Sequence, residues 1–155
     1  MSKFSEYVRI CKREPYSKIA VAIDKSMRSA AALCRALTIS KTFNSKLYII
    51  HVIPKKLPYA ISQKIEIPYE KYEILLKEGQ EELNFAKKLA EEIGLNAETV
   101  LLEGDPAEEI LNFIEKNGID LIIVGKKEKE DYIKNLGSVS ETIVKKAKIP
   151  VLIEI

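Results

Sequence analysis

From residue 120 the chain reads DLIIVG (120–125), KKEKEDYIKNL (126–136), GSVSETIVKKAK (137–148) and IPVLIEI (149–155), and this stretch decides the fold. DLIIVG is a continuous apolar run that ends at a glycine, which predicts a buried strand. GSVSE predicts a helix start, because Ser138 stands at the N-cap and Glu141, three residues later, completes a capping box. IPVLIEI predicts a final strand. The order is therefore strand, charged loop, helix, strand.

The predicted helix start at Gly137 and Ser138 has the properties of an anion site. The first backbone N–H groups of a helix have no partner within the helix, and the helix dipole adds partial positive charge there. Gly137 has no Cβ, so the chain can come close to a ligand. A strand that ends at Gly125, followed by this helix start, is a natural seat for a phosphate.

Three more strands are predicted upstream, at residues 18–23 (KIAVAI), 46–53 (KLYIIHVI) and about 97–102. Their nearly continuous apolar character is typical of parallel strands that are covered on both sides. His51 lies in the second of them. A single histidine in a strand is interpreted as a packed residue rather than as a ligand or base.

The segments between these strands have helical patterns. Ser26 can cap a helix that runs to about Thr42, with Ala30, Cys34 and Leu37 on one face. A long amphipathic pattern runs from Tyr72 to Ile93, and Gly94 ends it. Asp105 and Pro106 then begin a further helix, which Gly118 ends.

Strands and helices thus alternate from Lys18 to Ile155. This order predicts one parallel sheet with right-handed crossovers and helices on both faces. In such sheets ligands bind beyond the carboxyl ends of the strands, at the point where the winding reverses.

Length and composition favour an ordinary single domain. The chain has 155 residues, of which 46% are hydrophobic and 31% are charged, and its net charge is +2. So balanced a charge gives no reason to expect nucleic acid or an anionic membrane as a partner. The longest apolar runs have the length of strands, no signal peptide is recognisable, and a cytoplasmic location is expected. Cys34 is expected in the core, and a disulfide with Cys11 is not expected.

Residues 1–15 form an N-terminal extension ahead of a domain at 16–155. Phe4, Tyr7, Val8 and Cys11 recur at helical spacing, which predicts a short amphipathic helix. Packing over the domain or on a dimer partner is the favoured interpretation. Binding to a membrane surface is the alternative.

The sequence resembles the universal stress protein family. The resemblance is carried by IAVAID (19–24), LYIIHVI (47–53), GDPAEEIL (104–111), DLIIVG (120–125) and GSVSETIVKKAKIPVLI (137–153). It covers the chain from about Tyr16. It implies an adenine-nucleotide α-hydrolase-like α/β fold, with one doubly wound sheet of five parallel strands in the order 3-2-1-4-5. The winding then reverses between the first and fourth strands, whose following loops carry Asp24 and Gly125.

The resemblance also implies a site for ATP or a related adenine nucleotide. Asp24 matches an acid near the adenosine, and Val52 matches a residue whose backbone meets adenine. The phosphate-binding segment is matched by Gly125, Gly137, Ser138, Val139 and Ser140. From the residues alone, Asp24 has two open interpretations, as a ribose ligand or as the cap of the first helix. Lys126 and Lys127 can contact phosphates as point charges, or they belong to a solvated loop.

The glycine motif of this chain is degenerate. Its middle position is Glu128 instead of glycine, and the loop is one residue short. The favoured hypothesis is a regulatory nucleotide-binding module of the stress response, with at most slow ATP hydrolysis because no catalytic set is recognisable. A dimeric scaffold of the same fold that acts through protein contacts is the alternative. An enzyme similar to the ATP pyrophosphatases is a weaker one, because Asp24-Lys25-Ser26-Met27 stands where their glycine-rich loop would be.

The final strand predicts a homodimer. It is apolar and is expected at an edge of the sheet, where unpaired backbone groups are a liability unless they are covered. In the family this strand pairs with its copy in a second subunit. The expected dimer edge is made of Val151, Leu152, Ile153, Glu154 and Ile155.

Overall fold

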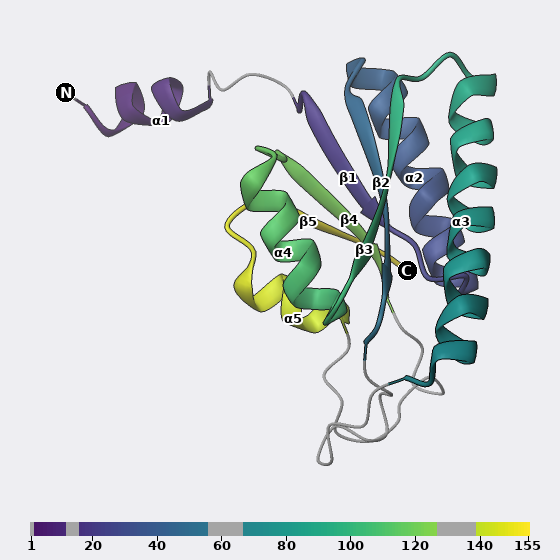
Figure 1. The fold of residues 1–155 in the computed structure, drawn as a ribbon. Coiled ribbons are helices and arrows are strands. Elements are labelled where there is room, and N and C mark those ends of the chain that lie inside the picture. The colour runs from purple at the N-terminus through teal and green to yellow at the C-terminus, as the bar shows by residue number, and fades with distance from the viewer. Residues whose placement is uncertain (1, 12–15, 56–66, 127–138) are drawn as a thin grey trace.

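The computed structural model describes residues 2–11, 16–55, 67–126 and 139–155. Helices and strands alternate along the chain after a first short helix (Figure 1). The strands are β1 (Lys18–Ala22), β2 (Lys46–Ile53), β3 (Ala97–Glu103), β4 (Leu121–Gly125) and β5 (Val151–Glu154). The helices are α1 (Lys3–Cys11), α2 (Met27–Phe43), α3 (Tyr69–Glu92), α4 (Pro106–Lys116) and α5 (Val139–Lys146).

The strands form one parallel sheet in the order β3-β2-β1-β4-β5, which confirms the predicted fold. β1 lies in the middle, with Val21 opposite Ile49 of β2 and Ile123 of β4. The central strands are buried on both sides, which is why their sequences are apolar without alternation.

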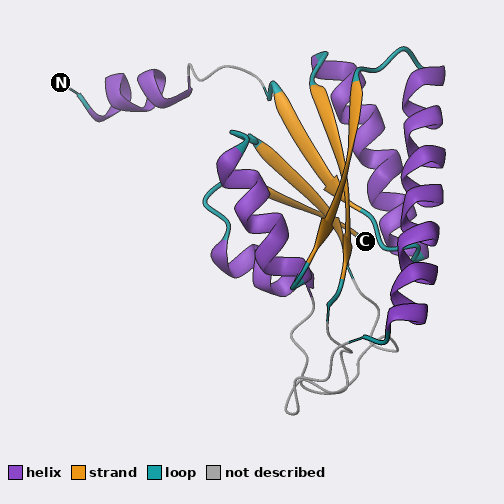
Figure 2. Ribbon diagram, viewed as in Figure 1, coloured by secondary structure: helices purple, strands orange, loops and turns teal. Residues whose placement is uncertain are grey.

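Helices cover both faces of the sheet, α2 and α3 on one and α4 and α5 on the other (Figure 2). Alternate residues of each strand enter the two layers of the core. Beneath α2 and α3 lie Ile19, Val21, Leu47, Ile49, Leu121 and Ile123. Beneath α4 and α5 lie Ala20, Tyr48, Ile50, Ile122 and Val124.

Both predicted N-caps at described helix starts are confirmed. The Ser26 side chain accepts a hydrogen bond from the Ser29 N–H at the start of α2, at 3.1 Å. Asp105 accepts one from the Glu108 N–H at the start of α4, at 3.0 Å, with Pro106 in the first turn. The capping box of Ser138 with Glu141 lies partly outside the described residues.

The predicted buried face of α2 is wrong for Ala30 and Cys34, whereas Leu37 is half-buried and packs against the core as expected. Ala30 and Cys34 are exposed, and the face that meets the sheet is instead made of Ser29, Ala32, Leu33, Ala36 and Ser40. The helix is rich in alanine on several sides, so hydrophobicity alone does not fix its rotation. Two serines on the buried face also interrupt its apolar pattern, so the sequence does not show which side of the helix is buried. Cys34 is therefore a surface thiol, and neither it nor Cys11 is in a disulfide.

At the amino end of the sheet, Asp120 joins the start of β4 to the start of β1. Its Oδ2 accepts hydrogen bonds from the Ser17 N–H, the Ser17 hydroxyl and the Lys18 N–H, each at 2.8 Å. Partial burial by itself raises the pKa of this carboxyl. The donors from Lys18 and Ser17 outweigh that effect, so the pKa of Asp120 is lowered.

No residue of α1 is buried, and Figure 1 shows the helix away from the sheet. The expectation that it packs over the domain of its own chain is therefore wrong. Its apolar side chains, which include Phe4 and Tyr7, do not find a complementary surface there. Within the described part of the chain, no helix is both long enough and apolar enough to cross a membrane.

Candidate functional site

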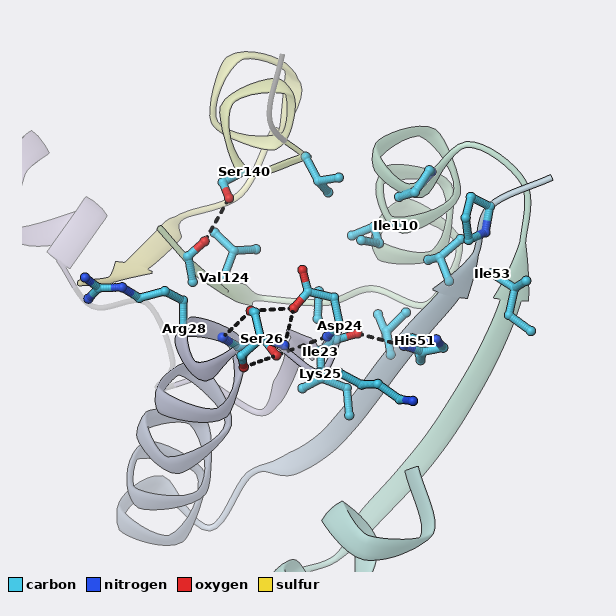
Figure 3. A pocket seen from close by; sticks show the side chains of 18 of the residues that line it. Ile23, Asp24, Lys25, Ser26, Arg28, His51, Ile53, Ile110, Val124 and Ser140 are labelled. Atoms are coloured by element: carbon cyan, nitrogen blue, oxygen red, sulfur yellow. Dashed lines mark hydrogen bonds between the residues drawn. The ribbon is translucent and has the colours of Figure 1, made fainter. Parts of the chain in front are cut away.

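A cavity of about 300 Å³ opens at the carboxyl ends of β1, β2 and β4 (Figure 3). It lies where the winding of the sheet reverses, which is where ligands are expected to bind in parallel sheets. Its lining comes from these strand ends, from the starts of α2, α4 and α5 and from one face of α3: Ala22, Ile23, Asp24, Lys25, Ser26, Arg28, Ser29, Ile50, His51, Val52, Ile53, Pro54, Leu75, Glu78, Pro106, Ile110, Val124, Gly125, Val139 and Ser140.

Asp24 projects into this cavity from the turn after β1 (Figure 3). Its Oδ1 accepts hydrogen bonds from the Ser26 N–H at 3.0 Å and from the Ser26 hydroxyl at 2.5 Å. The Ser26 oxygen, in turn, caps α2. Asp24 thus orients the capping serine and is not the cap itself. The second carboxylate oxygen is oriented to meet a ligand.

Lys25, the next residue, is in the left-handed region with φ 68°. Its backbone N–H donates to Glu82 Oε1 at 2.8 Å, and its ammonium group lies 2.7 Å from Glu78 Oε2. Both glutamates stand on α3, one turn apart, so α3 holds this turn from the side. Left-handed backbone is unfavourable for a residue with a Cβ, and these contacts oppose that cost.

His51 forms part of the cavity wall beside that turn. Its Nδ1 lies 2.9 Å from the Ile23 carbonyl oxygen. Because a carbonyl can only accept, Nδ1 carries the hydrogen in this contact. Glu82 Oε2 is 3.7 Å from the same nitrogen. A Cβ on Gly79 would lie only 2.7 Å from His51 Cδ2, so the glycine makes room for the ring.

Gly125 and Ser140 meet at the opposite wall. The Ser140 hydroxyl donates to the Gly125 carbonyl oxygen at 2.8 Å, which joins the start of α5 to the end of β4. A Cβ on Gly125 would come within 2.6 Å of the Arg28 carbonyl oxygen. Gly125 is therefore required for close packing of β4 on α2, in addition to any contact with a ligand.

Most of the described residues expected at the site line this one cavity: Asp24, Val52, Gly125, Val139 and Ser140. Lys126 does not line it. This lysine is exposed, and its N–H donates to the Glu154 carbonyl oxygen at 2.8 Å. Lys127, Gly137 and Ser138 lie outside the described residues.

Sequence reasoning missed Glu78, Glu82 and the part that His51 plays in the wall. The two acids stand four residues apart on α3, and Gly79 follows the first of them, a pattern that also fits a solvated helix face. A glycine between two acids indicates a site only once α3 is known to pass the end of β1. Within the described residues, no group of histidines, cysteines and acids is arranged to hold a metal ion.

The walls and the acid together define the class of protein. Val52 and Ile110 provide apolar surface on one wall, and Asp24 provides an acceptor beside it. A parallel sheet in the order 3-2-1-4-5 with such a cavity at its winding reversal defines an adenine-nucleotide α-hydrolase-like α/β protein.

Comparison with known proteins identifies the family. The pattern that describes the universal stress protein family matches residues 15–153. Universal stress protein MJ0531 of Methanocaldococcus jannaschii is 39% identical over 144 residues, which cover 89% of this chain and 81% of that protein. The chain belongs to the universal stress protein family, as its motifs predict.

Solved structures agree with this assignment. The structure of MJ0577, a universal stress protein of Methanocaldococcus jannaschii, is 28% identical with a TM-score of 0.74, over 90% of this chain and 95% of that one. A universal stress protein solved in complex with cAMP is 25% identical with a TM-score of 0.65, over 92% and 98% of the two chains.

Proposed function

We propose that this chain is a regulatory module of the stress response that binds an adenine nucleotide in the cavity at the ends of β1, β2 and β4. The observation that carries the proposal is the Asp24 carboxylate, which enters an otherwise largely apolar cavity at the winding reversal. The cavity volume of about 300 Å³ is at the lower end of the range for small-molecule sites. The relative solved with cAMP supports the same ligand class.

The geometry suggests a role for each wall. The apolar side chains of Val52 and Ile110, which lie on the same face of the sheet, suit a face of adenine. The Asp24 oxygen that is not bound to Ser26 suits the ribose hydroxyls, because a carboxylate can accept two of them. The start of α5, at Val139 and Ser140, lies across the cavity and suits the phosphate end.

A regulatory role fits better than catalysis. The Ser26 hydroxyl beside Asp24 is engaged in capping α2, and His51 directs its Nδ1 hydrogen to a main-chain carbonyl. The bound nucleotide would act as a signal, with ATP hydrolysed slowly at most. ATP, AMP and cAMP are all candidates.

The first test is binding. Mass spectrometry of ligand released from the purified protein, followed by calorimetric titration with ATP, AMP and cAMP, should detect an adenine nucleotide. Asp24→Ala should weaken the affinity by about tenfold or more, since a hydrogen bond to a charged group contributes about 1.5–3 kcal/mol.

Asp105→Ala is the matched control for this variant. It removes an acid that caps a helix, yet Asp105 does not line the cavity, so the affinity should stay within about twofold of the wild type. Absence of any co-purified nucleotide, together with no heat of binding at millimolar ATP, would reject the proposal in favour of a scaffold that acts through protein contacts.

We also propose that the protein works as a homodimer joined through β5. The Pro150 and Glu154 carbonyls accept hydrogen bonds from Ile122 and Lys126, on the β4 side. The backbone groups of successive residues in a strand point alternately to its two sides. The N–H and C=O groups of Val151, Ile153 and Ile155 therefore point away from β4, toward the open edge of the sheet. The side chains of Ile153 and Ile155 are 41% and 76% exposed, which supports pairing with a second copy. The free thiols of Cys11 and Cys34 suit the expected cytoplasmic location.

A further inference from the structure

We propose that Glu82 is a positioning residue: it holds Lys25 in the left-handed conformation and thereby aims the Asp24 carboxylate into the cavity. The inference deepens the proposed nucleotide site and rests on it for the identity of the ligand. Glu82 itself is not among the residues that line the cavity, so it acts through Lys25 and not by touching the nucleotide.

The Asp24-Lys25-Ser26 turn depends on the conformation of its middle residue. Lys25, at φ 68°, stands between Asp24 and the serine that donates to it. If Lys25 relaxed to the ordinary right-handed or extended regions, the Ser26 hydroxyl would no longer point at Asp24 Oδ1. The carboxylate would then lose the contact that fixes its direction. A lysine, unlike a glycine, must be held in this conformation from outside.

Glu82 is the group that does so. Its Oε1 accepts the Lys25 N–H at 2.8 Å, while its side chain is only 17% exposed. Its Oε2 is buried and, within the described part of the chain, makes no hydrogen bond. That oxygen lies 3.7 Å from His51 Nδ1, whose hydrogen is directed to Ile23. A buried carboxylate oxygen without a partner lowers stability, so stability alone does not explain this glutamate. Its grip on Lys25 does.

Glu78 plays a lesser part. It binds the Lys25 ammonium group at 2.7 Å, but both side chains of this ion pair are more than 40% exposed. Exposed pairs of this kind contribute little. Glu78→Ala is therefore the matched control. It removes a carboxylate one turn from Glu82 that binds the side chain of Lys25, whereas Glu82 binds the backbone of Lys25.

The first experiment uses the ligand-free protein. The NMR chemical shifts of Lys25 Cα and Cβ report whether its backbone is left-handed. We expect the left-handed pattern in the wild type, in Glu82→Gln, which keeps an accepting oxygen, and in Glu78→Ala. We expect its loss in Glu82→Ala. An unchanged Lys25 pattern in Glu82→Ala would overturn the proposal.

The second experiment compares AMP with 2′,3′-dideoxy-AMP, which lacks the hydroxyls that Asp24 would accept. We expect the wild type to prefer AMP by about tenfold, and Asp24→Ala and Glu82→Ala to lose that preference. A merely structural role of Glu82 would weaken both ligands equally. Glu82→Ala combined with Lys25→Gly should recover the preference, because glycine adopts positive φ without strain. Full preference in Glu82→Ala would contradict the proposal.

The two proposals fail in different ways. A wild type that binds neither nucleotide would reject the nucleotide site, and the Lys25 shifts would still decide whether Glu82 holds the turn. A wild type that binds AMP, with Glu82→Ala unchanged in both shifts and preference, would reject the positioning role alone.

Discussion

At the scale of single residues, Gly125 serves packing as well as any ligand. It resembles the first glycine of a phosphate-binding motif, yet it also lies against the backbone of Arg28 so closely that a methyl group has no room. Its φ is not in the left-handed region, so backbone freedom is not the reason for glycine. A motif residue can therefore be retained for the fold even where a ligand is lost.

Gly125→Ala should destabilise the protein by about 1–3 kcal/mol, the usual cost of overpacking, because the new Cβ meets the Arg28 main chain, which cannot move aside easily. Urea unfolding measures this. Gly118→Asn is the control: that site has φ 62° and open space, and asparagine tolerates this conformation, so the change should stay within about 0.5 kcal/mol. Wild-type stability in Gly125→Ala would refute the packing argument.

At the scale of elements, Asp120 connects two neighbouring strands through one carboxylate oxygen. The lowered pKa of Asp120 means that the folded protein holds the ionised form more firmly than the unfolded chain does. The resulting stabilisation is fully present above the unfolded pKa, near the ordinary value of 3.8. It is lost as the pH falls through the lower folded pKa.

Asp120→Asn should therefore be less stable than the wild type at pH 7. The gap in unfolding free energy should stay constant down to about pH 5 and shrink below about pH 4, as the wild-type carboxyl becomes protonated. Urea titrations at several pH values measure it. Glu115→Gln, at an exposed position of α4, serves as the control for loss of one negative charge. A gap that is the same at pH 3 and pH 7 would contradict the role of ionisation.

The bounds of a strand or helix were predictable where its sequence has a clear apolar run or a clear capping residue. β2 begins and ends where its apolar run does, and both Ser26 and Asp105 cap helices as their positions predict. The rotation of α2 was not predictable, because alanines surround it and serines line its buried side. The length of a helix follows from local chemistry, whereas its rotation depends on what it packs against.

At the scale of the whole molecule, the position of the site was predictable, but the contacts from α3 that hold the Asp24 turn were not. Strand order and the reversal of winding bring Asp24 and Gly125 together, and both follow from the order of elements and the family resemblance. The contact from Glu82 to Lys25 spans 57 residues and joins α3 to the turn after β1. No local sequence pattern in either segment predicts such a contact.

The dimer proposal is tested at β5. Ile153→Pro removes one outward N–H. It keeps the hydrogen bonds that the Pro150 and Glu154 carbonyls accept from the β4 side, and proline is tolerated at sheet edges. Light scattering at micromolar concentration should show a dimer for the wild type and for Ile153→Val, and a monomer for Ile153→Pro. A wild type that remains monomeric would refute strand pairing.

The wall of the cavity contains a built-in spectroscopic probe. The sequence has a single histidine, and its ring lies beside the turn that carries Asp24. An ordinary proton spectrum of the unlabelled protein would hold one set of imidazole resonances, which need no assignment. Their movement during a titration would count occupied cavities directly, compound by compound, so a panel of metabolites could be screened without tagging or altering a single atom.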